Sequence, residues 1–189
     1  MKLPQKIADF LWVTVRIWKY SWLSDAKNVK GKPILYHPLL LKGKGKISFG
    51  NHVTIGVKAS PLYYSHYTFL EARTKDSEIE IGDHVAISNG FSVEAYSKIT
   101  IKSNVLIGVN CSVTDNDGHH LEPEKRNETN LIALPVLIEE NVFVGDNVSI
   151  LKGVTIGRNS VIGKGAVVTK DIPENAVAAG IPAKVIRFL

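Results

Sequence analysis

The chain has 189 residues, of which 44% are hydrophobic and 22% charged, and it has a single cysteine. This fits one globular domain with a small appendage and excludes a disordered chain, a collagen-like chain and a disulfide scaffold. The net charge of +5 is uneven, because residues 1–46 carry ten Lys and Arg against two Asp (+8), whereas residues 47–189 carry 13 basic and 16 acidic residues (−3). The excess of positive charge therefore belongs to one segment and does not predict a nucleic-acid-binding domain.

Residues 1–46 are predicted to be a helical or extended leader. Its aromatic run, residues 10–23, holds all three Trp of the chain but is too short and too charged to span a bilayer. Lys2 and Lys6 precede the run as in a signal peptide, but no cleavage site follows convincingly, so we expect the leader to be retained.

The aromatic run has the spacing of an amphipathic helix. The apolar face would hold Ile7, Phe10, Leu11, Thr14, Val15, Trp18 and Trp22, and the wetter face Lys6, Asp9, Arg16 and Lys19. Two interpretations remain open. The helix covers the end or flank of the main domain, or it lies on an anionic membrane surface as basic aromatic helices do.

Residues 47–189 repeat with a period of six. In the three clearest stretches the first position is Ile or Val in all twelve copies, namely Ile81, Ile87, Val93, Ile101, Ile107, Val113, Ile138, Val144, Ile150, Ile156, Ile162 and Val168. This period is neither the 2 of a strand nor the 3.6 of a helix. It predicts short strands separated by turns and stacked in coils that bury one apolar column. Gly recurs at the second position, where we expect it to permit the tight turn.

The repeat is interrupted between Val113 and Ile138 and then resumes in frame. Residues 114–135 are therefore predicted to form a long loop outside the coil. A long loop that interrupts a rigid scaffold is more often functional than not. This one contains His119 and His120 after the polar run Thr114-Asp-Asn-Asp-Gly.

The repeats resemble those of the bacterial hexapeptide-repeat acyltransferases. The ending, Ala178-Ala-Gly-Ile-Pro-Ala-Lys-Val-Ile-Arg187 after Thr169-Lys-Asp-Ile-Pro173, resembles the sugar O-acetyltransferase branch, which includes galactoside and maltose acetyltransferases. The resemblance is strong over residues 79–188, weak over 47–61 and absent over 1–46. It implies an all-β fold, a left-handed parallel β-helix with an extruded catalytic loop and a C-terminal tail at 171–189. It also implies a homotrimer with its sites between subunits.

Within the loop, His119-His120-Leu-Glu-Pro123 resembles the His-Pro-Leu-Asp-Pro stretch of the maltose enzymes. Acyl transfer from a thioester to an alcohol requires a base, and His suits neutral pH. The resemblance assigns this role to His119, with His120 as the competing choice. Asp117 or Glu122 would orient the ring, and a backbone N–H of the coil would stabilise the oxyanion. The alternative is that both His are solvated loop residues.

The resemblance implies acetyl-CoA as co-substrate and assigns binding residues by position. Gly145 and Asp146 would meet the pantetheine arm, Lys164, Thr169 and Lys170 would line the cofactor groove, and Lys184 and Arg187 would lie near the nucleotide phosphates. Asp146 and Lys164 depart from the Ser and Ala of the galactoside enzyme. Asn89 and Glu94, with Asp117, are the candidates for contact with the acceptor.

Three functions remain open. The first is an O-acetyltransferase acting on a sugar hydroxyl in surface polysaccharide or lipopolysaccharide assembly. The second uses the same fold on the amine of a nucleotide-sugar or on an antibiotic. The third is a γ-class carbonic anhydrase or a noncatalytic scaffold. His84 and His119 would be the zinc ligands, but the third His expected a few residues after the second is missing, so no metal is expected. His37, His52, His84 and Cys111 are interpreted as structural. We expect a cytoplasmic protein, with peripheral membrane contact left open.

Overall fold

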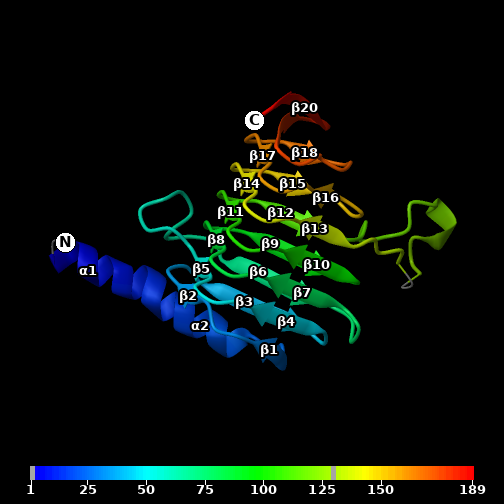
Figure 1. Cartoon of the computed structure of the whole chain (residues 1–189). Helices are drawn as coiled ribbons and strands as arrows, with labels where there is room; N and C mark the ends of the chain where they lie inside the picture. The colour runs from blue at the N-terminus through cyan, green and yellow to red at the C-terminus, as the bar shows by residue number, and fades with distance from the viewer. Residues whose placement is uncertain (1–2, 129–130) are drawn as a thin grey trace.

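The structure is a computed structural model that describes residues 3–128 and 131–189. Its main body is a left-handed parallel β-helix, in which each coil contributes one strand in turn to each of three sheets (Figure 1). The chain rises through the stacked coils, so that neighbouring strands in a sheet come from successive coils. The predicted fold class is confirmed.

The three sheets are named A, B and C. Sheet A contains β1 (Asn28–Lys30), β4 (Lys46–Phe49), β7 (Glu78–Ile81), β10 (Lys98–Ile101), β13 (Val136–Ile138) and β16 (Thr155–Ile156). Sheet B contains β2 (Ile34–Leu35), β5 (Thr54–Ile55), β8 (Ala86–Ile87), β11 (Leu106–Ile107), β14 (Phe143–Val144), β17 (Val161–Ile162), β19 (Ala176–Gly180) and β20 (Ala183–Phe188). Sheet C contains β3 (Leu39–Gly43), β6 (Thr68–Ala72), β9 (Ser92–Ala95), β12 (Ser112–Thr114), β15 (Ser149–Ile150) and β18 (Val167–Val168).

The first positions of the repeats stack in register to form the core. In sheet A, Ile81 pairs with Ile101, which pairs with Ile138, and all three side chains are buried. Their methyl groups contact those of the coils above and below, so that one continuous cluster fills the interior. The antiparallel pair β19 and β20 lies at the C-terminal end of this column.

The tight corners are made at the fourth position of the repeat, by asparagine or by Gly153 and Gly165, and not by the glycine of the second position. Asn141, Asn147 and Asn159 occupy the fourth position of their repeats, with φ values of 58°, 55° and 60°. Gly145 lies outside the left-handed region, but a Cβ there would lie 2.8 Å from the backbone nitrogen of Lys164 in the next coil. The expected reason for this glycine was therefore wrong: it permits close stacking of coils, and the asparagine or glycine at the fourth position supplies the turn.

The coil begins earlier in the chain than residue 47. The strands β1, β2 and β3 are the first strands of their sheets, so residues 28–43, assigned from the sequence to the leader, form the first coil. Its inward side chains Val29, Leu35 and Leu41 are only partly buried, because an end coil has a neighbour on one side only. Two of them are Leu, which hides the repeat signal in this segment.

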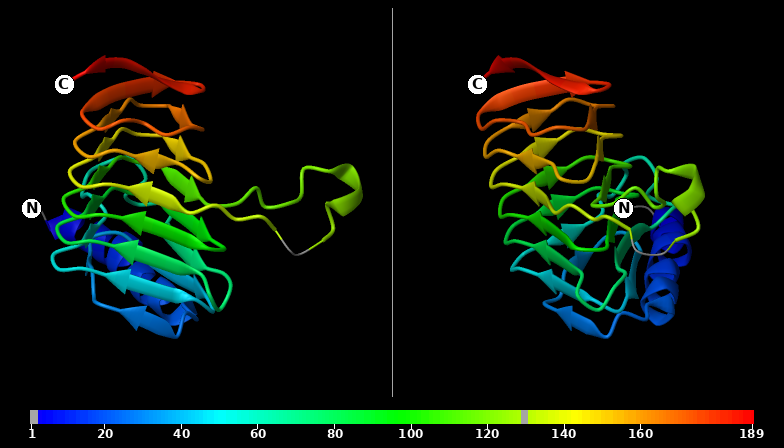
Figure 2. Two further views of the ribbon diagram at one scale, coloured as in Figure 1. Left: turned by 45° about the vertical axis from the view of Figure 1, so that its right-hand side comes forward. Right: turned by 90° about the vertical axis from the view of Figure 1, so that its right-hand side faces the viewer.

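Residues 3–23 of the leader form one helix, which consists of α1 (Leu3–Asp9), a π-helical segment η1 (Phe10–Thr14) and α2 (Val15–Leu23). It lies along the flank of the first coils (Figure 2, right). It is attached through Val13, which is buried, and through Tyr20, whose ring stacks on that of Tyr67 with 4.5 Å between centroids. No helix among residues 3–128 and 131–189 is long and apolar enough to cross a bilayer.

The helix carries its apolar stripe on the outer face. The predicted apolar face points to solvent, with Trp18 59% and Trp22 83% exposed. Two residues assigned to the wetter face instead contact the coil domain: Asp9 accepts a hydrogen bond from the Tyr64 hydroxyl at 2.8 Å, and Arg16 donates to the carbonyl oxygen of His66. The stripe exists as predicted, but it does not attach the helix to the domain, because polar contacts from the other face do so.

His37 is fully buried under the loop that connects β5 and β6. Its Nε2–H donates to the carbonyl oxygens of Leu62 (3.1 Å) and Ser65 (3.0 Å), and Nδ1 has no hydrogen-bond partner among the residues described. Burial, helped by the Arg16 charge, lowers the pKa of His37 below its usual value.

This depressed pKa predicts a loss of stability in acid. The unfolded chain binds the proton more readily than the folded one, so His37 stabilises the fold above about pH 6.5 and this contribution is lost as pH falls. Urea unfolding at about pH 8 and about pH 5 should show a drop that His37→Gln reduces, because Gln keeps the donor without titrating. The exposed His52→Gln should keep the full drop, and an equal drop in all three proteins would contradict the assignment.

Cys111 faces the core and its thiol donates to the Gly145 carbonyl oxygen at 3.0 Å. Burial raises the pKa of the thiol to about 11. Because the thiolate is the reactive form, alkylation of the native protein at about pH 8 should be slower than that of the urea-unfolded chain by about 100-fold or more. Mass spectrometry of iodoacetamide-treated samples measures both rates, and equal rates would show that the thiol is accessible.

Candidate active site

The long loop leaves sheet C after β12 and returns to sheet A at β13, so it projects from the corner between these two sheets (Figure 2, left). Asp115, at its start, is fully buried. Its carboxylate accepts hydrogen bonds from the backbone N–H groups of Tyr96 (2.8 Å) and Ser97 (2.7 Å) in the preceding coil. The coil therefore fixes the point at which the loop departs.

The next residue turns the chain toward the two histidines. Asn116 is buried, and its Oδ1 accepts a hydrogen bond from the N–H of Gly118 at 2.7 Å. This is an Asx turn, in which a side chain replaces a backbone acceptor. On the return side, Leu134 donates its N–H to the Asp115 carbonyl oxygen at 2.8 Å. Both ends of the loop are thus held, and His119 lies just beyond the turn.

His119 is exposed, and its Nδ1 lies 3.0 Å from the carbonyl oxygen of Arg126 across the loop. A carbonyl oxygen can only accept a hydrogen bond, so Nδ1 must carry the proton. In the neutral ring, Nε2 then keeps its lone pair. This tautomer and this exposure are what a general base acting through Nε2 requires.

The residues around His119 have other partners. The side chain of His120 is only 10% exposed, with Nδ1 3.9 Å from Oε2 of Glu122. Asp117 forms an ion pair with Lys152, which follows β15 in the next coil. The role of orienting the His119 ring, expected of Asp117 or Glu122, is given in this structure to the backbone carbonyl of Arg126.

Two hollows adjoin the loop. A small one of about 90 Å³ is lined by His119, His120, Lys152 and neighbouring loop residues. A shallow groove of about 270 Å³ lies on the outer face of sheet C, where Glu94 and Asp117 both line it. The structure thus brings two of the three acceptor candidates to one groove beside the base of the loop. Ser92, Ser112 and Thr114 add hydroxyl groups to it.

Asn89, the third acceptor candidate, has a different place. It is fully buried, and its Nδ2 donates to the carbonyl oxygens of Val57 (3.0 Å) and Pro61 (2.9 Å), while its Oδ1 accepts from the Val57 N–H (3.0 Å). These bonds hold the loop between β5 and β6. Asn89 therefore positions that loop and does not face a substrate, in contrast to the expectation.

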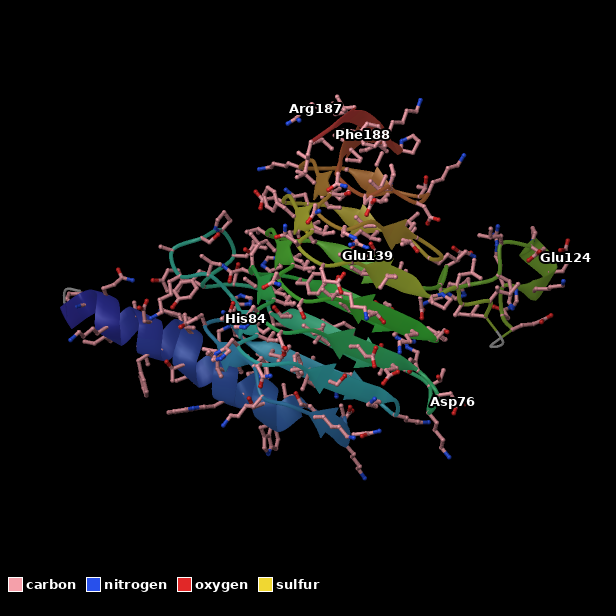
Figure 3. All side chains as sticks on the ribbon, in the orientation of Figure 1. Asp76, His84, Glu124, Glu139, Arg187 and Phe188 are labelled. Atoms are coloured by element: carbon pink, nitrogen blue, oxygen red, sulfur yellow. The ribbon has the colours of Figure 1, made fainter. Side chains whose placement is uncertain are left out.

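The predicted cofactor residues lie in three places. Gly145, Asp146 and Lys164 are at turns between sheets B and C, Thr169 and Lys170 are at a turn between sheets C and A, and Lys184 and Arg187 are on β20. Only the second group, Thr169 and Lys170, shares the corner from which the loop of residues 114–135 projects. Arg187 lies at the C-terminal end of the column, well separated from Glu124 in the loop (Figure 3).

The side chain of Asp146 also joins coils. It accepts a hydrogen bond from the Val109 N–H at 2.9 Å and lies 3.4 Å from the Lys164 ammonium. Lys164 remains largely exposed, so the pair leaves a polar edge with an accessible ammonium group at this corner. A phosphate-bearing or amide-bearing ligand would find both a cation and coil backbone there.

Several residues of the site were missed from the sequence. Asp115 and Asn116 belong to the polar run that ends β12, which is a signal for an anchored turn. Lys152 stands at an ordinary repeat position, and the acceptor on Arg126 is its backbone. Neither of these has any signature in the amino-acid sequence.

The zinc alternative gains no support from the geometry. His84 follows β7 at the corner between sheets A and B, where its ring stacks on that of His52 at 5.0 Å. The loop that carries His119 leaves from a different corner, and Figure 3 shows His84 far from Glu124 of that loop. Within residues 3–128 and 131–189, no group of three or more His, Cys, Asp or Glu is placed to hold a metal ion.

Comparison with known proteins identifies the repeats. Residues 135–170 match the family model described as bacterial transferase hexapeptide (six repeats). Galactoside O-acetyltransferase of Escherichia coli (strain K12) is 36% identical over 169 residues, which cover 85% of this chain and 78% of that protein.

Two solved structures share the fold. The polySia specific acetyltransferase NeuO has a TM-score of 0.59 at 32% identity, and the match covers 86% of this chain and 68% of that chain. A galactoside acetyltransferase in complex with coenzyme A has a TM-score of 0.59 at 34% identity and covers 74% and 64%. Taken with the three parallel sheets and the extruded loop, these matches show that the chain belongs to the hexapeptide-repeat acyltransferase family.

Proposed function

We propose that this acyltransferase transfers an acetyl group from acetyl-CoA to a hydroxyl group of a sugar, with His119 as the general base. The observation that carries the proposal is the 3.0 Å contact between Nδ1 of His119 and the Arg126 carbonyl oxygen, which leaves a basic Nε2 on an exposed loop. Nε2 takes the proton of the hydroxyl as its oxygen bonds to the acyl carbon. It then gives the proton to the sulfur that leaves as a thiol. A backbone N–H of the coil stabilises the negative charge that develops on the acyl oxygen.

The groove on sheet C fits a sugar acceptor. Glu94 and Asp117 supply carboxylate acceptors, and Ser92, Ser112 and Thr114 supply hydroxyl groups. A polyol is bound through such a mixture of donors and acceptors. The relatives named above are galactoside and polySia acetyltransferases, which supports a sugar acceptor within a surface polysaccharide or lipopolysaccharide.

The donor site is proposed to lie between subunits of a homotrimer. Thr169 and Lys170 lie at the corner of the loop, whereas Asp146 and Lys164 lie at the opposite edge of sheet C. One chain therefore presents these two pairs at different corners. A neighbouring copy would bring its own Asp146 and Lys164 toward the loop. Lys184 and Arg187 on β20 supply cations for the nucleotide phosphates. The use of acetyl-CoA, a cytoplasmic metabolite, supports a cytoplasmic location.

Release of free CoA from acetyl-CoA tests the proposal. The purified protein is incubated with galactosides, sialylated oligosaccharides, nucleotide-sugars and simple amines, and the thiol is measured colorimetrically. We expect turnover with sugar hydroxyls. Turnover confined to amines would select N-acetylation, and mass spectrometry of the product distinguishes an ester from an amide. No thiol release with any acceptor, together with no acetyl-CoA binding by calorimetry, would contradict the proposal.

A further inference from the structure

The helix at the N-terminal end of the protein exposes an apolar stripe. Ile7, Leu11, Trp18 and Trp22 lie on one face, with 52%, 51%, 59% and 83% of their surface exposed. Phe10 extends the stripe through an edge-to-face contact with Trp18 at 5.7 Å. Monomeric proteins rarely leave so many large apolar side chains together in water, so the stripe marks an interaction surface.

The exposure of this stripe does not come from a detached helix. The opposite face is anchored by buried Val13, by the stacking of Tyr20 on Tyr67, and by the hydrogen bond from the Tyr64 hydroxyl to Asp9. The helix is therefore held in place by one face, and its other face is presented outward.

The first coil adds a second apolar feature beside the end of this helix. A cavity of about 600 Å³ opens there, lined by Leu35, Leu39, Leu41 and Phe49. Ser21 and Ser24, on either side of Trp22 in the sequence, line it from the helix. The apolar column of the coil thus opens next to the stripe, at the end of the molecule where α2 meets β1 (Figure 1).

A basic rim borders this opening. An adjacent cavity of about 850 Å³ is lined by residues at the ends of β1, β3 and β6, and these include five cations and the carboxylates of Asp25 and Glu71. The five cations are Lys27, Lys42, Lys44, Arg73 and Lys75. The helix adds exposed Lys6 and Lys19. Its single carboxylate, Asp9, is bonded toward the coil domain.

We propose that this end of the protein, the apolar stripe with its basic rim, docks on the surface of an anionic phospholipid bilayer. Tryptophan is favoured at the boundary between hydrocarbon and headgroups, and Lys and Arg beside it attract anionic lipid. The charge of +8 on residues 1–46 complements such a surface. The helix lies in the plane of the interface, and the coil stands above it.

Intrinsic fluorescence tests this directly, because all three Trp of the chain are in the helix. The full chain is mixed with vesicles of phosphatidylcholine alone, or of equal parts phosphatidylcholine and phosphatidylglycerol. With the anionic vesicles we expect a blue shift, quenching by brominated lipid and co-sedimentation, all weakened by added salt. Neutral vesicles should bind much less.

Matched variants separate the contributions of the apolar stripe and of the basic rim to vesicle binding. The double variant Trp18→Ser with Trp22→Ser should weaken vesicle binding by about tenfold or more. Its control is Leu106→Ser with Phe143→Ser, which removes two apolar side chains that are about half exposed on sheet B. We expect this control to bind vesicles as the wild type does. Lys27→Gln with Lys44→Gln should weaken it by about 30-fold, from about 1 kcal/mol per cation. Lys102→Gln with Arg158→Gln removes the same charge elsewhere and should have little effect.

Absence of a blue shift and of sedimentation with anionic vesicles would overturn the proposal. So would equal binding of the wild type and the double Trp variant. If the wild type does not sediment and the double Trp variant has a lower molar mass by light scattering, the stripe is an interface between copies of the chain. None of these measurements uses acetyl transfer, so their failure is independent of the proposed activity.

Discussion

Replacing His119 by Asn is expected to lower kcat by about 10²- to 10⁴-fold, the contribution typical of a general base. The Asn amide can still donate to the Arg126 carbonyl oxygen, which now accepts from Nδ1 of His119 at 3.0 Å. The substitution therefore keeps the loop contact and removes the basic Nε2. Steady-state rates of CoA release measure kcat, and calorimetry should show unchanged binding of acetyl-CoA.

His120→Asn is the matched control, because it makes the same change at the adjacent position. We expect it to stay within a few-fold of the wild type, since His120 is largely buried beside Glu122. Loss of turnover in His120→Asn with full turnover in His119→Asn would move the base to His120. Full turnover in both would show that neither histidine acts as the base.

The coil could be predicted from the sequence because its physical cause repeats. Each coil needs a β-branched side chain at the same inward place, so Ile81, Ile101 and Ile138 recur at a fixed position of the six-residue pattern. The first coil was missed because its inward residues, such as Leu35 and Leu41, are half-covered and under weaker constraint. The helix stripe was found, but spacing alone does not say which face is turned to the domain.

The loop of residues 114–135 could also be predicted only in part. Its existence follows from the interruption of the repeat, and the role expected of its histidines follows from the resemblance. The partner of His119 could not be predicted, because the Arg126 acceptor is a backbone carbonyl brought across the loop by folding. Asn89 was misassigned for a related reason: its amide satisfies the backbone of another loop, which depends on long-range packing.

The anchor at Asp115 provides the second large effect. Asp115→Ala removes three hydrogen bonds, those from the Tyr96 N–H, the Ser97 N–H and the Asn116 side-chain amide, and leaves the N–H groups of half-buried Tyr96 and Ser97 without their acceptor. An unsatisfied buried polar group costs about 1–3 kcal/mol, so we expect the free energy of unfolding to fall by about 2–5 kcal/mol. The loop also loses its fixed point of departure, which should lower kcat in the protein that remains folded. Urea titration followed by circular dichroism measures the first effect, and CoA release the second.

Asp76→Ala is the control for this change, because Asp76 is exposed on a turn between β7 and the strand before it (Figure 3). Surface substitutions of this kind change stability by about 0.5 kcal/mol or less. Asp115→Asn provides a graded case, since its one amide oxygen can replace only part of the carboxylate. We expect its stability and its turnover to lie between those of the wild type and Asp115→Ala. If Asp115→Ala matched Asp76→Ala in both measurements, the loop would have to be held by the bond from Leu134 and the Asn116 turn alone.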